Sequence, residues 1–63
     1  MESVTRREAI YETLSKAIQP IKGSELAKMY QVSRQVIVQD IELLRAKGIQ
    51  VVATPSGYMI QEP

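Results

Sequence analysis

The chain has 63 residues, enough for one domain, and a domain of this size buries only about 60% of the surface that its unfolded chain exposes. It contains no cysteine and no histidine, which excludes disulfides, thiolate chemistry and the commonest metal ligand and general base, so we expect no catalytic site, no metal site and no cofactor. Eight Lys and Arg residues against seven Asp and Glu residues give a net charge of +1, which neither supports nor excludes nucleic-acid binding.

The first predicted helix begins at Thr5, because Thr5 and Glu8 have the spacing of a capping box. Pro20 cannot continue a helix, so the helix should end near Ile18, and Ile21 should begin a short extended piece. The buried stripe of this helix consists of apolar side chains at helical spacing: Ile10, Leu14 and Ala17.

The second predicted helix covers residues 23–30 and is short. A small side chain at Ala27 allows another helix to cross closely, as in a helix-turn-helix. The turn that follows places Val32 toward the core, and glycine would be easier than Gln31 if that position is left-handed. The side chains expected to face the core are Leu26, Ala27 and Tyr30.

The third predicted helix covers about residues 33–47. Ser33 is a favourable N-cap, and Gly48 supplies a left-handed residue after the helix. Asp40 is expected to anchor the helix to a nearby Arg or Lys. The buried stripe repeats at i, i+4 and i+7: Ile37, Ile41 and Leu44.

The opposite face of this third helix offers hydrogen-bonding groups, one cation and one small apolar side chain. An ordinary solvated surface is one interpretation, and base readout in a DNA groove is the other. Glutamine amides pair with adenine, valine contacts a thymine methyl group, and arginine takes guanine or a phosphate. The residues are Arg34, Gln35, Val38 and Gln39.

The last part of the chain predicts a β-hairpin, with strands at residues 49–54 and 58–61. Pro55, Ser56 and Gly57 form the expected connection, a three-residue loop with a bulge at the glycine. Inward-facing side chains are Ile49, Val51, Tyr58 and Ile60. Three helices followed by a hairpin predict an α+β fold, a winged helix-turn-helix, as a single domain over residues 1–63.

Several polar residues suit contacts with a nucleic-acid backbone. Lys22 and Ser24 lie at the amino end of the second helix, where free amides commonly receive a phosphate, and Ser33 with Arg34 can do the same at the third. The turn of the hairpin can approach a backbone through Thr54 and Ser56, although a plain hairpin turn is an equal alternative.

The chain closely resembles the amino-terminal domain of niacin-responsive bacterial repressors and, more loosely, that of the biotin operon repressor. The residues that carry the resemblance are Glu25-Leu26-Ala27, the run from Val32 to Ile41, Leu43-Leu44-Arg45-Ala46, Ala53-Thr54 and Gly57-Tyr58. The resemblance implies a transcriptional repressor that binds double-stranded DNA near genes of NAD or niacin metabolism. The implied DNA-contacting residues are Ser33, Arg34, Gln35, Val38 and Gln39.

In those repressors a carboxy-terminal domain with clustered histidines binds metal and effector, and that property does not transfer to this chain. We expect the chain to be the N-terminal part of a longer protein that forms a homodimer, and to be monomeric or weak in binding by itself. A protein-interaction module, with Leu43 and Val36 as an apolar flank, and a self-association domain are the alternatives. No basic leader and no long apolar run occur, so we expect a cytoplasmic protein without a membrane partner.

Overall fold

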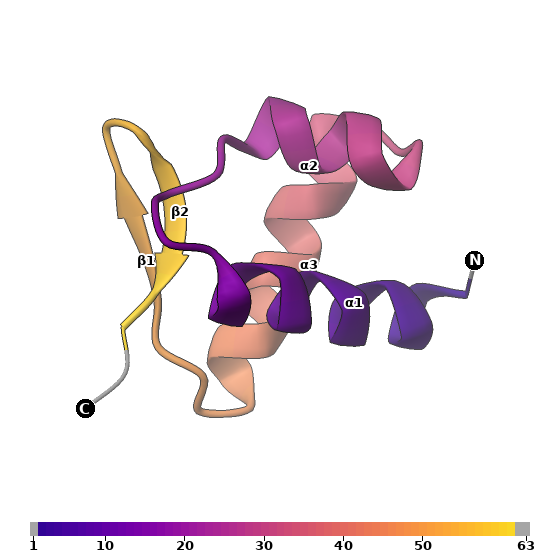
Figure 1. Cartoon of the computed structure of the whole chain (residues 1–63). Coiled ribbons are helices and arrows are strands. Elements are labelled where there is room, and N and C mark those ends of the chain that lie inside the picture. Colours follow the sequence, from indigo (N-terminus) through magenta and orange to yellow (C-terminus); the bar gives the residue numbers. More distant parts are fainter. Residues whose placement is uncertain (1, 62–63) are drawn as a thin grey trace.

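The computed structural model describes residues 2–61, which form three helices followed by a two-stranded antiparallel sheet (Figure 1). The elements are α1 (Ser3–Lys16), α2 (Gly23–Tyr30), α3 (Arg34–Ala46), β1 (Val51–Thr54) and β2 (Gly57–Ile60). α3 crosses behind α1, α2 packs near one end of α3, and the hairpin, here called the wing, closes one side. The predicted winged helix-turn-helix architecture is confirmed.

The start of α1 differs from the prediction. The helix begins at Ser3, two residues before Thr5, and its N-cap residue Glu2 makes no side-chain capping bond. The Arg6 amide donates to the Glu2 carbonyl oxygen at 2.8 Å, so the first turn closes on the backbone alone. The predicted capping box between Thr5 and Glu8 is therefore wrong, because Thr5 is already inside the helix.

The end of α1 also comes slightly early. The last helical residue is Lys16, because Ala17 already adopts an extended conformation with ψ of 137°. Ala17 is half-buried after the helix rather than within its stripe, and Ile18 is 97% exposed. The chain thus leaves the helix two residues before the predicted end and reaches Pro20 through a bend.

The connection from α2 to α3 follows the predicted scheme. α2 has the predicted bounds, and Gln31 after it is left-handed, with φ of 56° and ψ of 48°. Val32 is half-buried against the core. The Ser33 hydroxyl accepts a hydrogen bond from the Val36 amide at 3.2 Å, which confirms the predicted cap of α3. Gly48 has φ of +95° after the other end of that helix, also as predicted.

The turn of the wing is tighter than predicted. Thr54 pairs directly with Gly57, so only Pro55 and Ser56 connect the strands, and the predicted three-residue loop is wrong. The Thr54 hydroxyl donates to the Gly57 carbonyl at 2.8 Å and accepts from the Ser56 amide at 3.1 Å. These two bonds close the turn and leave Gly57, with φ of +136°, as the first residue of β2.

The segment between α1 and α2 extends the small sheet. The Ile21 amide donates to the Tyr58 carbonyl at 2.9 Å, and the Tyr58 amide donates to the Ile21 carbonyl at 2.7 Å. The predicted extended piece at Ile21 is thus confirmed as an isolated antiparallel bridge to β2. It ties the wing to the residues that lead into α2.

One apolar core lies between the three helices and the wing. Its fully buried members are Ile10, Leu14, Leu26, Ile37, Ile41, Leu44 and Val51. The half-buried residues packed against it are Ile21, Ala27, Tyr30, Val32, Ile49, Tyr58 and Ile60. These sets contain the predicted inward-facing residues of α2, α3 and the wing. Within residues 2–61, no helix combines the length and the apolar character needed to cross a bilayer.

Candidate nucleic-acid interface

The outward face of α3 consists of the exposed residues Arg34, Gln35, Val38 and Gln39. Packing of Ile37 and Ile41 into the core turns this face away from the protein. Val38 is 40% exposed, as its position about 100° from the buried stripe predicts, so part of an apolar side chain faces solvent here. The face is open to a ligand over its first two turns.

Asp40 holds the only carboxylate in these two turns, residues 34–41, and the fold removes it from the outward face. The side chain is 2% exposed, and both of its oxygens accept hydrogen bonds from Arg6, Nε to Oδ2 at 2.5 Å and Nη2 to Oδ1 at 3.1 Å. Arg7 Nη1 lies 4.0 Å from Oδ1. The hydrogen bond to Asp40 raises the pKa of Arg6. The predicted anchoring role of Asp40 is confirmed.

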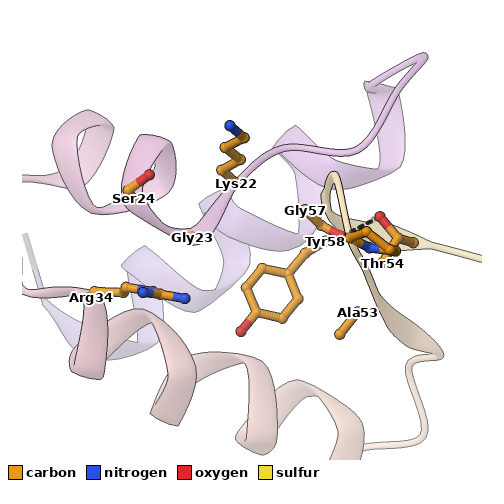
Figure 2. A pocket seen from close by; sticks show the side chains of 9 residues that line it. Lys22, Gly23, Ser24, Arg34, Ala53, Thr54, Gly57 and Tyr58 are labelled. Carbon is orange, nitrogen blue, oxygen red and sulfur yellow. Dashed lines mark hydrogen bonds between the residues drawn. The ribbon is translucent and has the colours of Figure 1, made fainter.

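A hollow of about 390 Å³ lies where the start of α2, the start of α3 and the wing meet (Figure 2). Lys22 and Arg34 bring two positive charges to it, and none of its lining residues is acidic. Neither cation forms an ion pair with another residue in the range 2–61. The lining residues are Lys22, Gly23, Ser24, Arg34, Ala53, Thr54, Pro55, Gly57 and Tyr58.

The amino end of α2 forms one wall of this hollow. The first helical bonds are donated by the amides of Glu25 and Leu26 to the Lys22 carbonyl, which leaves the amides of Gly23 and Ser24 ahead of the helical ladder. Free amides and the positive end of the helix dipole favour an anion here. A Cβ at Gly23 would lie 3.2 Å from the Tyr58 ring, so glycine permits the close approach of the wing to this helix end.

The predicted contact residues fall into three groups according to where they lie in the structure. Four of them line the hollow: Lys22, Ser24, Arg34 and Thr54. Gln35, Val38 and Gln39 lie outside the hollow on the outward face of α3. The Ser33 hydroxyl is occupied by its capping bond, and Ser56 lies in the exposed turn, where its amide binds Thr54. DNA contact by these nine residues remains a prediction.

The sequence predicts Tyr58 as a core residue alone, and the structure gives it a second role. Its ring packs against the core and also forms a wall of the hollow, on the wing side and facing Gly23 (Figure 2). The alternation of the strand predicted an inward side chain. The bridge between Ile21 and Tyr58 brings that side chain beside α2. Because this bridge joins segments that are distant in the sequence, no local sequence pattern predicts it.

The chain matches a family model described as "HTH domain" over residues 6–59. The chain belongs to this family. As an HTH domain it is 47% identical over 57 residues to "Transcription repressor NadR" of Bacillus subtilis (strain 168), a match that covers 90% of the chain and 32% of that relative. It is also 47% identical over 55 residues to "Probable transcription repressor NiaR" of Thermotoga maritima, covering 87% of the chain and 31% of that relative.

These matches confirm the resemblance drawn from the residues. The HTH domain spans about one third of the length of the two curated relatives. The matched range includes all of α2 and α3 and most of the wing, and therefore both the outward face of α3 and the hollow.

Proposed function

We propose that this chain is the sequence-specific DNA-binding domain of a bacterial transcription repressor and that α3 enters the major groove. The observation that carries the proposal is the outward face of α3, which presents two amides, one valine and one arginine while the Asp40 carboxylate is buried. The major groove accommodates one helix, and a recognition helix reads base edges with its first turns. The two repressors named above support the proposal by their names and by their similarity.

The arrangement of the outward face suggests how bases are read. Gln35 and Gln39 are spaced i, i+4, so their amides project to the same side, where each can pair with N6 and N7 of an adenine. Val38 lies beside them and suits the methyl group of a thymine. Arg34, at the start of the helix, suits either a guanine or a phosphate. We therefore expect A·T pairs within the recognised half-site.

The hollow supports a contact with the DNA backbone beside the groove. Lys22, the Ser24 hydroxyl and the free amides at the start of α2 can hold one phosphate. Thr54 and Ser56 place the turn of the wing within reach of the neighbouring backbone. No cation lies in that turn, so its contribution is small.

The biological role is proposed from the relatives. We propose that the chain is the N-terminal part of a longer cytoplasmic repressor, without catalytic function, that acts near genes of NAD or niacin metabolism. Two copies in a homodimer would engage a palindromic operator, because linking two weak modules raises their effective affinity. A biotin-repressor type of domain remains the alternative within the same fold. No effector is assigned to this domain.

A binding experiment with two duplexes tests the DNA-binding proposal. The first duplex is selected by the unmodified chain from a randomised pool, and the second has the same composition in scrambled order. We expect a preference for the selected duplex, and an affinity that falls with salt at a slope of about −3.6 if about four phosphates are neutralised. Failure to enrich any sequence, together with salt-independent binding, would contradict the proposal.

A protein-interaction module is the competing function, since Leu43 on α3 is 46% exposed. Replacing Leu43 with Asp separates the two functions. DNA binding should keep its preference for the selected duplex, because Leu43 lies outside the outward face. A function that depends on an apolar partner should be lost in the same variant and should be nearly insensitive to salt.

A further inference from the structure

We infer that the ion pair between Arg6 and Asp40 is a positioning device: it fixes the rotation of α3 about its own axis and thereby determines which bases the outward face reads. The inference rests on the proposed DNA-binding function and adds to it a specificity-determining pair that contacts no DNA. Arg6 lies on α1 and Asp40 on the protein side of α3, so the ion pair joins the two helices across their interface.

Asp40 is well placed for this role because it follows Val38 and Gln39 directly in the helix. The Asp40 side chain points into the protein, where the Arg6 guanidinium donates hydrogen bonds to both carboxylate oxygens. The side chains of Val38 and Gln39 point outward. A fork of two hydrogen bonds to one carboxylate restricts direction as well as distance. Any rotation of α3 moves Asp40 and Gln39 together.

The apolar core alone gives a weaker restriction. Burial of Ile37, Ile41 and Leu44 is favourable over a range of helix rotations, because hydrophobic burial has no preferred direction. A rotation of about 20° moves an atom that lies about 6 Å from the helix axis by about 2 Å. Donor to acceptor distances in hydrogen bonds span only about 0.5 Å, so such a rotation breaks a bidentate contact with a base.

The position of Arg7 beside Asp40 affects the choice of variants that can test the ion pair. It approaches the same carboxylate at 4.0 Å, and its buried Nε has no hydrogen-bond partner among the described residues. Removing Asp40 alone would therefore leave two guanidinium groups beside an apolar core and would mix a loss of stability with a loss of specificity. Removing one positive and one negative group together keeps the net charge at +1 and hence the general attraction to DNA.

The test uses the double variant Arg6→Met/Asp40→Leu, which replaces the pair by apolar side chains. A second variant, Arg6→Lys, keeps the charge but cannot form the two-bond fork. The matched control is Glu12→Gln/Lys16→Gln, which removes an exposed ion pair of α1, 3.0 Å long, and is equally neutral in net charge. Each protein is titrated with the selected and the scrambled duplex, and its thermal midpoint is recorded.

For the double variant we expect the ratio of the two affinities to fall about tenfold or more, the discrimination provided by one bidentate base contact. Its affinity for the scrambled duplex should stay within about twofold of the unmodified value, since its charge is unchanged. Arg6→Lys should lower the same ratio at a thermal midpoint above the working temperature, and the control should leave it unchanged. If the double variant does not fold, Arg6→Lys decides.

An unchanged ratio in a folded variant that lacks the fork would overturn the inference and leave the proposed function intact. An unmodified chain that does not prefer its selected duplex would instead overturn the proposed function. The two failures are therefore distinguishable in the same set of titrations.

Discussion

Gly57 lies directly against the Ile21 carbonyl group, and a Cβ atom on Gly57 would be only 2.5 Å from the Ile21 oxygen. The next residue of the wing, Tyr58, bonds to Ile21 through both of its backbone groups. The wing and the start of α2 are thus held together by the backbone, so the two main walls of the hollow form one unit.

This close approach predicts an unusual sensitivity at Gly57. Gly57→Ala should be destabilising both because φ is +136° and because the methyl group would collide with the backbone of Ile21 and Lys22. Gly48→Ala is a matched control, since Gly48 has φ of +95° but no neighbour within 4 Å of an added Cβ. In urea unfolding we expect Gly57→Ala to cost about 1 to 3 kcal/mol more than the control, the range for overpacking. Equal losses in the free energy of unfolding for the two variants would show that the wing can move to accommodate the added methyl group.

The Ser33 cap predicts a moderate change in stability. Ser33→Ala removes the hydroxyl that accepts from the Val36 amide and should cost about 1 kcal/mol, or a fall of several degrees in the thermal midpoint of a domain this small. Ser15 is the control, because its hydroxyl binds the Tyr11 carbonyl inside α1 and caps no free amide. Ser15→Ala should be neutral or slightly stabilising. Identical results for the two serines would contradict the capping role.

The charge in the hollow predicts a change in salt dependence. Lys22→Gln or Arg34→Gln should weaken binding to the selected and scrambled duplexes equally if the residue holds a phosphate, and should reduce the slope of log K against log salt by about 0.9. Lys47 lies about 20 Å from Arg34 at the other end of α3, a distance along the helix axis that follows from 13 residues at about 1.5 Å each. Lys47→Gln should leave the slope unchanged. A loss confined to the selected duplex would instead make Arg34 a base-reading residue.

The two glutamines of α3 predict the opposite pattern. Gln35→Ala or Gln39→Ala should cost about 1 to 3 kcal/mol on the selected duplex and little on the scrambled one. Gln50, an exposed glutamine beyond the end of α3, serves as the control and should change neither affinity on replacement by Ala. Equal losses on both duplexes would contradict base readout.

Most of the fold could be predicted from the sequence because local signals agreed with the packing. The bounds of α2, the Ser33 cap and the glycine after α3 each follow from propensities that act within a few residues. The prediction at Thr5 was wrong for the same reason: a capping box is a local signal, and the backbone of Glu2 closed the first turn without it.

The candidate site was predictable only in part. The outward face of α3 follows from helical periodicity, because the buried stripe determines which side remains open. The hollow does not follow from helical periodicity, because it depends on the pairing of Ile21 with Tyr58, which are 37 positions apart. Nothing in the sequence near either residue predicts this pairing. Asp40 lies between these cases: its spacing indicated an anchor, and only the structure identified Arg6 and Arg7 as its partners.

The proposed function requires α3 to meet DNA with its glutamine-bearing side. Amide chemical-shift mapping of the chain during titration with its selected duplex shows which side of α3 the DNA contacts. We expect the largest changes at Gln35, Val38 and Gln39, with smaller ones around Lys22 and none along the solvent side of α1. Unperturbed signals from Gln35 and Gln39 at saturating duplex would contradict the proposed function.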